Sequence, residues 1–320
     1  MNFQHLLKIE NSKFYIDTAF RAANDKAKSA RQEIKGQRSV VEKSKTVELA
    51  KIESVSRFLN KSLNKILENF PRIIDLNDFY RELLGCYVDI SELRKSLGAV
   101  GWASDKVGHF YREYNVKIKR TKELKKINEY RRMFYGRAAS AVRQVDKHLK
   151  IIDEARRIMK NFPSIKENIF TVAITGFPNV GKSTLLNKLT GANAEVASYA
   201  FTTKSLNLGY IFEEGKRAVQ LIDTPGSLNR FEKMNNIEKQ AVLAMKYCAN
   251  IIVYIFDPTE TYPIEDQVKL YDETKELEKE IIIYVSKTDI AEIPEKIKKL
   301  KLISSIEDVK REILELKKSS

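Results

Sequence analysis

Apolar residues recur at helical spacing through nearly all of the first half of the chain. Residues 39–70 are typical, because their apolar side chains follow every three or four positions and neither glycine nor proline interrupts them. Breaks are expected near Gly36, near Pro71 and around Gly98–Gly101. The pattern predicts a bundle of helices over residues 1–160.

The clearest single helix is predicted for residues 134–160. Its apolar positions form one stripe: Phe134, Ala138, Ala141, Val142, Val145, Leu149, Ile152 and Met159. Five basic side chains with few acids beside them fall on the opposite face: Arg132, Arg143, Lys147, Lys150 and Arg157. The pattern therefore predicts one continuous helix with a basic ridge about 30–40 Å long. Pro163 ends it, because proline disfavours helix in the residue before it.

The pattern changes after residue 168. Short β-branched runs predict strands: Ile169–Thr175, Val219–Ile222, Ile251–Phe256 and Ile281–Val285. They alternate with helical stretches over 292–300 and 307–316. Alternating strands and helices are typical of a mostly parallel sheet covered on both faces. We predict an all-α helical-bundle domain over 1–163 followed by an α/β domain over 164–320.

Charge divides the 320 residues along the same line. The formal net charge is +14. Residues 1–160 hold 35 Lys and Arg against 20 Asp and Glu, whereas residues 161–320 hold 22 against 23. The excess positive charge therefore lies in the helical half, which indicates two domains with different partners.

The remaining composition indicates a cytoplasmic protein. Its start has no basic-then-apolar signal pattern, and its longest apolar runs, such as residues 251–256, are too short to span a bilayer. Cys86 and Cys248 are far apart and fit neither metal nor disulfide spacing. Nothing in the pattern suggests dimerisation, so a monomer is expected.

The stretch from Gly176 to Thr184 carries the phosphate-loop spacing G-x-x-x-x-G-K-[ST]. It follows an apolar strand and precedes a helix, so its backbone N–H groups can surround anionic phosphates. That context argues against a chance match in a glycine-containing turn. We expect Lys182 to reach the β- and γ-phosphates and the Ser183 hydroxyl to ligate Mg²⁺. The predicted phosphate-binding residues of this loop are Asn179, Gly181, Lys182, Ser183 and Thr184.

A second motif, Asp223-Thr-Pro-Gly226, follows the next predicted strand. An Asp at the carboxyl end of a neighbouring strand can orient Mg²⁺, and the Gly226 N–H can meet the γ-phosphate. Alone, these four residues would equally fit an ordinary turn. Their position after the phosphate loop favours a nucleotide-sensing switch in a Ras-like P-loop domain.

The nucleotide base is indicated by Ser286-Lys287-Thr288-Asp289, directly after another apolar run. A carboxylate here can accept hydrogen bonds from guanine N1 and its exocyclic amine, which adenine lacks. We therefore expect Asp289 to select GTP and GDP, and the Lys287 stem to cover the ring. Ser304 and Ser305 are weaker candidates for a last guanine-contacting loop.

Residues 195–210, EVASYAFTTKSLNLGY, resemble the first switch of Obg-related GTPases, most closely that of the nucleolar GTP-binding protein (NOG) family. Residues 134–149 and 235–241 support the resemblance, which covers about residues 115–305. Residues 1–110 share with the family mainly a helical and basic character. Longer family members carry a C-terminal extension, so the sequence looks like a short form.

The resemblance implies action in assembly of the large ribosomal subunit. It also implies that Thr203, or less favourably Thr202, ligates Mg²⁺ when the γ-phosphate is present. The family has Asn or Thr where this chain has Ser286. The hydroxyl is kept and the amide is lost, which puts tight holding of the nucleotide in question.

Hydrolysis is expected to be slow. Ras-like enzymes place a water-orienting Gln directly after the Asp-x-x-Gly turn, where this chain has Ser227. All three histidines precede the nucleotide domain, so no histidine base is expected. Asn179 either binds K⁺, as in related GTPases with Asn in this loop, or simply turns the loop.

The basic half indicates an anionic partner, because Lys and Arg ridges bind phosphates without reading sequence. Ribosomal RNA of the large subunit or its precursor is favoured, with the five residues of the basic ridge as candidate contacts. Aromatic side chains nearby fit a bundle core better than RNA stacking. Two alternatives remain open: an RNA-bound assembly placeholder with a structural nucleotide, and a GTPase acting on tRNA or at an anionic membrane. Membrane insertion is not expected, since a bundle buries its apolar stripes.

Overall fold

The computed structural model describes residues 2–34, 39–191, 195–196, 207–224, 236–259 and 261–319. The described chain forms two compact units. The helical unit consists of residues 4–75 and 88–160. The nucleotide unit consists of residues from 1–3, 76–87 and 161–320. The all-α and α/β fold classes are thus confirmed, while the domain boundary at 163/164 stays a prediction.

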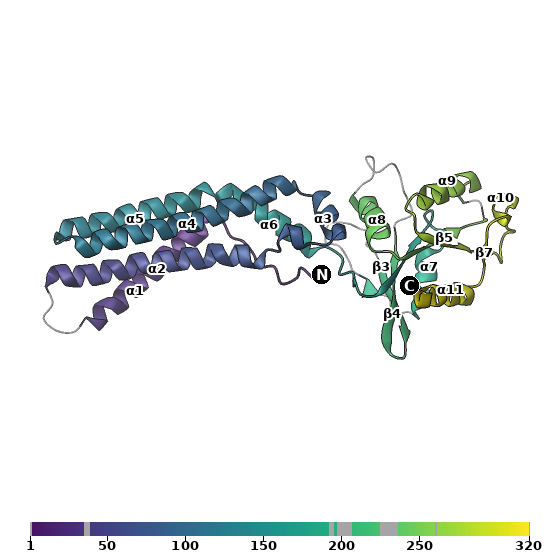
Figure 1. Cartoon of the computed structure of the whole chain (residues 1–320), viewed down its shortest axis with the longest axis horizontal. Helices are drawn as coiled ribbons and strands as arrows, with labels where there is room; N and C mark the ends of the chain where they lie inside the picture. Colours follow the sequence, from purple (N-terminus) through teal and green to yellow (C-terminus); the bar gives the residue numbers. More distant parts are fainter. Residues whose placement is uncertain are drawn as a thin grey trace. The chain divides into compact units, whose positions relative to one another are not determined.

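The helical unit is built from long antiparallel helices (Figure 1). These are α1 (Ser12–Glu33), α2 (Val40–Asn69), α4 (Ile90–Arg120), α5 (Leu124–Gln144) and α6 (Asp146–Lys160), with a 3₁₀ turn at Ile73–Asp75. Side-chain oxygens cap three N-termini: Asn11 caps α1, Asp89 caps α4, and Ser39 forms a capping box with Glu42 on α2. The predicted break near Pro71 follows the end of α2, whereas Gly36 lies outside the described residues.

The apolar stripe predicted over 134–160 is buried, but the helix is not continuous. α5 ends at Gln144, and α6 starts at Asp146 after Val145 leaves helical geometry at φ −97° and ψ 9°. Val145 itself is buried, so the break lies on the core side of the chain. Spacing alone did not reveal it, because a single non-helical residue barely changes the phase of the stripe.

The break predicted around Gly98–Gly101 is wrong, because α4 runs through both glycines. A glycine inside a helix is less favourable than alanine by only about 1 kcal/mol. The neighbouring Val100 and Ala103 are fully buried, so packing outweighs that propensity. The helix predicted over 292–300 is also shorter than expected, since α10 covers only Glu295–Lys298.

A buried charge cluster joins α2 to α5. The Glu48 side chain, 8% exposed, accepts a hydrogen bond from Lys51 Nζ at 2.6 Å and lies 2.8 Å from Arg131 Nε. The contact with Arg131 is close but not aligned as a hydrogen bond, so its contribution is mainly Coulombic. Removing the negative charge leaves two mostly buried cations without their carboxylate partner.

Glu48→Gln is therefore expected to lower the free energy of unfolding of the helical unit by about 2 kcal/mol. Urea unfolding followed by Trp102 fluorescence measures it, because the single tryptophan lies on α4. Glu53→Gln is the matched control, since the Glu53–Arg57 pair on the same helix is exposed. That control should change stability by less than about 0.5 kcal/mol. Equal losses in both variants would contradict a structural role for the cluster.

The nucleotide unit contains a sheet with strand order β2-β3-β4-β1-β5-β6-β7 in the described residues. The strands are β1 (Phe170–Thr175), β2 (Glu195–Val196), β3 (Asn207–Glu213), β4 (Lys216–Asp223), β5 (Ile251–Phe256), β6 (Glu280–Val285) and β7 (Leu302–Ile303). Strands β4, β1, β5, β6 and β7 run parallel, whereas β3 is antiparallel to both β4 and β2. The mostly parallel sheet is confirmed.

Helices cover both faces of this sheet (Figure 1). α7 (Lys182–Thr190) and α11 (Ile306–Ser319) bury apolar side chains against one face. α8 (Asn236–Tyr247), α9 (Ile264–Lys275) and α10 pack on the other. β5 is buried along its whole length, which explains its unbroken run of apolar residues.

A short helix from the middle of the first half, α3 (Asp78–Gly85), belongs to the nucleotide unit. Fully buried Tyr80 donates a hydrogen bond from its hydroxyl to Pro163 O at 2.6 Å and accepts one from Ile165 N at 3.1 Å. The Gln240 amide of α8 donates to the Tyr87 hydroxyl. Sequence periodicity could not predict this attachment, because α3 resembles its helical neighbours.

Candidate functional site

The predicted nucleotide-binding residues meet at the carboxyl edge of the sheet. β1, β4, β5 and β6 are adjacent and parallel, so the loops that follow them emerge on the same side. Ile174 near the end of β1 pairs with Asp223 on one side and with Val253 on the other. This edge is where open α/β sheets bind ligands.

The phosphate loop depends on two glycines in conformations that other residues rarely adopt. Gly176 has φ +143°, and a Cβ there would lie 2.7 Å from Ile255 O. Gly181 has φ +100° and starts α7 directly. Between them Val180 is fully buried and anchors the loop to the core. The spacing of the motif is thus a consequence of backbone geometry.

Lys182 lies in the first turn of α7 and is 8% exposed. Its ammonium donates hydrogen bonds to Gly176 O at 3.0 Å and to Phe177 O at 2.6 Å. The charge is therefore held under the loop by carbonyl groups, at the N-terminus of a helix where anions are favoured. This placement suits contact with a phosphate chain.

Ser183 and Asp223 come together from α7 and β4. The Ser183 hydroxyl donates to Asp223 Oδ2 at 2.6 Å, and Asn207 Nδ2 donates to the same oxygen at 3.1 Å. Asp223 is 6% exposed, and its other oxygen, Oδ1, has no hydrogen-bond partner among the described residues. A hydroxyl beside a carboxylate with an unused buried oxygen fits Mg²⁺, which takes few protein oxygens alongside substrate phosphates.

The other two loop residues are exposed. Asn179 has φ +62°, a left-handed conformation that asparagine adopts more readily than most residues. The loop geometry alone therefore accounts for asparagine at this position, and K⁺ binding stays a prediction. Thr184 follows Ser183 on α7, with its side chain in solvent.

The guanine-recognition candidates follow β6. Ser286 is buried and donates its hydroxyl to Phe256 O at 3.2 Å, so it ties β6 to β5. Lys287 has φ +53°, and its ammonium pairs with Asp257 at 2.5 Å. Asp289 is exposed in the turn that follows. A carboxylate open to solvent at this edge is available to a base.

The weaker candidates lie between β7 and α11. The Ser305 hydroxyl donates to Glu307 Oε2 at 3.0 Å and accepts from Asp308 N at 3.4 Å, so Ser305 acts as a helix cap. Ser304 is exposed. Their guanine contact stays a prediction.

Four residues singled out from the sequence lie outside the described residues: Thr202, Thr203, Gly226 and Ser227. Their proposed roles in Mg²⁺ binding, γ-phosphate contact and hydrolysis therefore rest on sequence alone.

All five residues of the basic ridge are exposed. Arg132 lies in the middle of α5, Arg143 lies in its last turn, and the other three lie on α6. The expectation of few acids beside the ridge is wrong. Lys147 pairs with Glu92, Lys150 with Asp146, and Arg157 with Asp153. Arg132 and Arg143 form no ion pair among the described residues.

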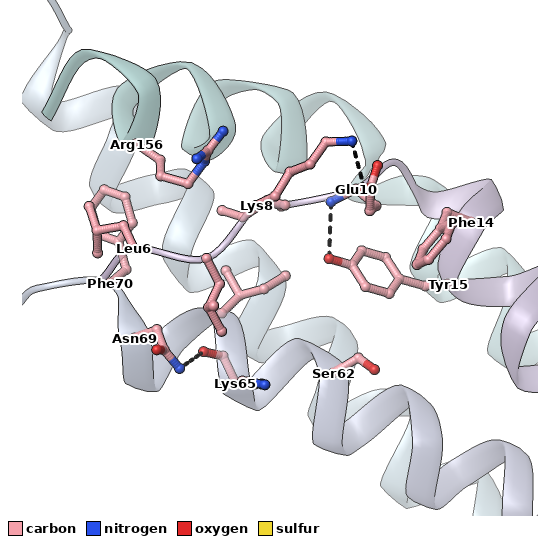
Figure 2. A pocket seen from close by; sticks show the side chains of 13 residues that line it. Leu6, Lys8, Glu10, Phe14, Tyr15, Ser62, Lys65, Asn69, Phe70 and Arg156 are labelled. Atoms are coloured by element: carbon pink, nitrogen blue, oxygen red, sulfur yellow. Dashed lines mark hydrogen bonds and ion pairs between the residues drawn. The ribbon is translucent and has the colours of Figure 1, made fainter. Parts of the chain in front are cut away.

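Sequence patterns did not predict a recess of about 300 Å³ in the helical unit. Figure 2 shows it between the extended segment 6–10 and α2. Lys8 pairs with Glu10 at 2.8 Å, and the Tyr15 hydroxyl accepts from Glu10 N at 3.1 Å, which fixes the segment (Figure 2). Its walls come from residues far apart in sequence, so no local signal marks it.

The described residues support neither a reactive thiol at Cys248 nor a membrane-spanning helix. Burial raises the pKa of the Cys248 thiol to about 12, so this cysteine stays protonated near neutral pH. In the parts of the chain that the structure describes, no helix is both long and apolar enough to cross a membrane.

Comparison with known families accounts for both units. The family model described as the NOG1 N-terminal helical domain matches residues 3–166. A second model, described as a 50S ribosome-binding GTPase, matches residues 171–287. An uncharacterized protein of Methanocaldococcus jannaschii is 39% identical over 254 residues, which cover 78% of this chain and 71% of that protein. The chain belongs to the NOG1 family. The resemblance noted from the first-switch sequence is thus confirmed, and the α/β domain of this NOG1-family protein is a P-loop GTPase domain.

Other NOG1 relatives are longer. Nucleolar GTP-binding protein 1 of Saccharomyces cerevisiae is 33% identical over 82% of this chain and 41% of its own length. The Candida glabrata protein of the same name is 34% identical over 76% of this chain and 38% of its own length. The chain therefore spans less than half of these nucleolar relatives. A crystal structure of a Plasmodium falciparum protein with this name is 27% identical over 49% of this chain and 91% of that one, with a TM-score of 0.41.

Proposed function

We propose that this NOG1-family protein is a slow GTPase that acts in the cytoplasm as a nucleotide-controlled switch in biogenesis of the large ribosomal subunit. The observation that carries the proposal is the meeting of Ser183 and Asp223 at 2.6 Å behind a phosphate loop, in a chain whose other half is basic. The 50S ribosome-binding description of the matching GTPase family and the nucleolar names of the relatives support the ribosomal assignment.

In this proposal, Lys182 moves its hydrogen bonds from the loop carbonyls to the β- and γ-phosphates. Asn179, Gly181 and Thr184 line the phosphate chain around it. Ser183, Asp223 and Thr203 would hold Mg²⁺, which would supply charge neutralisation at the phosphates. Asp289 reads the guanine edge and Lys287 covers the ring, with Ser304 and Ser305 closing the far side.

The γ-phosphate orders the segments of Thr203 and Gly226, and hydrolysis releases them. Hydrolysis is slow because Ser227 cannot orient water as glutamine does. Asn179 would compensate if it holds K⁺ near the phosphates; the alternative is that Asn179 only turns the loop. Equal single-turnover rates in potassium and sodium buffers would remove the potassium role.

The helical unit contacts ribosomal RNA through its exposed cations. Arg132 and Arg143 are the strongest candidates because they pair with no acid among the described residues, whereas Lys147, Lys150 and Arg157 must exchange a carboxylate for a phosphate. The protein binds as a monomer and without membrane insertion.

Cosedimentation with purified large ribosomal subunits tests the function, with GDP or a non-hydrolysable GTP analogue and at two salt concentrations. Binding that prefers the GTP analogue and weakens with salt is expected. Equal binding in both nucleotide states would indicate a placeholder with a structural nucleotide. Preferential binding to tRNA or anionic vesicles would move the function to those partners.

Ser183→Ala is expected to remove most of the Mg²⁺ dependence of GTP binding. The hydroxyl is a proposed ligand, and its loss leaves Asp223 without its 2.6 Å partner. Titration with a fluorescent GTP analogue in Mg²⁺ and in EDTA measures the dependence. We expect the variant to lose about tenfold in affinity with Mg²⁺ and little in EDTA. An equal loss in both buffers would indicate damage to the loop instead.

A further inference from the structure

The loop that follows β5 is fixed to the sheet by one side chain of α9. The Gln267 amide is fully buried. Its nitrogen donates to Asp257 O and to Tyr262 O, both at 2.9 Å, and its oxygen accepts from Asp257 N at 2.9 Å. Gln267 thus supplies the hydrogen-bond partners of three backbone groups at the two ends of this loop. These bonds hold Asp257 at the carboxyl edge of the sheet.

The Asp257 carboxylate is 1% exposed and faces Lys287. Oδ1 accepts from Thr259 N at 3.0 Å and from the Thr259 hydroxyl at 2.7 Å, while Oδ2 accepts from Lys287 Nζ at 2.5 Å. Burial alone would raise the pKa of Asp257, but the bonds from Lys287 and Thr259 outweigh it and lower the pKa below its usual value. The group is therefore a directed, ionised acceptor.

The Asp257 carboxylate restricts the conformations of the Lys287 side chain. Its backbone lies in the left-handed region, so its side chain leaves the chain in an uncommon direction. A free lysine side chain samples many rotamers, and this conformational freedom is lost when a ligand fixes the side chain. With its ammonium held by Asp257, the four-carbon stem is confined before any nucleotide arrives.

We propose that Asp257 is a positioning residue for guanine-nucleotide binding: it holds the Lys287 ammonium so that the lysine stem is already placed against the purine ring. This inference rests on the proposed function, because it requires the base to sit beside Lys287. Asp257 touches neither base nor phosphate and acts only through Lys287. In the competing, purely structural role, Asp257 only stabilises the loop after β5 through its hydrogen bonds with Thr259.

A double-mutant cycle separates the two roles. The variants are Asp257→Asn, Lys287→Ala and their combination, and the readout is the equilibrium affinity for fluorescent GDP. Asp257→Asn is expected to weaken GDP binding about tenfold, and Lys287→Ala by a similar factor. The double variant is expected to bind no more weakly than Lys287→Ala alone, because Asp257 has nothing left to position.

Inosine diphosphate provides a second readout. The lysine stem contacts the ring face, so Asp257→Asn should weaken GDP and inosine diphosphate by the same factor. Glu265→Gln is the matched control, since Glu265 forms an exposed ion pair with Lys296 in the same unit. It should leave both affinities unchanged.

Independent, multiplying losses in the double variant would overturn the positioning role and leave the structural one. Unchanged GDP affinity in Asp257→Asn would overturn it as well. A wild-type protein that binds no guanine nucleotide would instead overturn the proposed function, and this inference with it. Thermal unfolding of each nucleotide-free variant shows whether the unit remains folded.

Discussion

The Lys182→Ala variant is expected to lose at least about a hundredfold in affinity for GTP and GDP, which corresponds to about 2.7 kcal/mol. Lys182 is 8% exposed, and its ammonium is held by two loop carbonyls at 3.0 and 2.6 Å. The cation is thus already desolvated, and its exchange of carbonyls for phosphate oxygens requires little reorganisation. No other described cation is fixed in this loop.

Equilibrium titration with fluorescent GTP and GDP measures the loss. Lys188→Ala is the matched control, because Lys188 lies on the same helix with an exposed side chain. The control removes the same charge from the same unit and should change affinity less than about twofold. Thermal unfolding without nucleotide shows whether the loop survives the loss of its internal donor. A Lys182→Ala protein that is folded and binds within threefold of wild type would contradict the phosphate-loop assignment.

The phosphate loop could be predicted from sequence because its determinants are local. The motif consists of an apolar run, two glycines at fixed spacing and a following helix, all within about 15 residues. The structure places Gly176 and Gly181 in the conformations that the motif requires. The four strands predicted from β-branched runs are present as β1, β4, β5 and β6, whereas β3 was not predicted. The run over 251–256 is buried along its length, and its bounds as a strand agree with the apolar run.

The features that escaped prediction depend on contacts between distant residues. The glycines of α4 predict a break, but the packing of Val100 and Ala103 keeps the helix continuous. α3 has the same local pattern as its neighbours, and it is attached to the nucleotide unit by contacts with distant residues, among them the hydrogen bonds of Tyr80 and the bond from Gln240 to Tyr87. The Asp257–Lys287 pair joins residues 30 positions apart. No periodicity encodes such pairings.

The guanine-binding residue could also be predicted from a short motif, on the basis of side-chain chemistry. The carboxylate chemistry of Asp289 and its place after β6 predict a contact with guanine, and Asp289 is exposed at the carboxyl edge of the sheet. Nearby Ser286 is occupied in a hydrogen bond to Phe256 O. The Asp289 carboxylate is therefore available to bind the nucleotide base.

Asp289→Asn is expected to exchange guanine for xanthine specificity. The carboxylate accepts two hydrogen bonds from guanine, and each bond to a charged group contributes about 1.5–3 kcal/mol. An amide retains one acceptor and presents a donor where guanine also donates, so GTP affinity should fall by roughly a hundredfold or more. Xanthine carries a carbonyl in place of the amine. The amide can donate to that carbonyl, so XTP should bind the variant better than GTP does.

Competition titrations with GTP, XTP and ATP against one fluorescent nucleotide give all three affinities. Asp272→Asn is the control, because Asp272 forms an exposed ion pair with Lys275 on α9. The substitution removes the same charge from the same unit. It should leave the order of the three nucleotides unchanged. An Asp289→Asn protein that still prefers GTP would show that another group reads the base. A loss of all three nucleotides together would point to damage of the loop, because only a change in their order reports on base recognition.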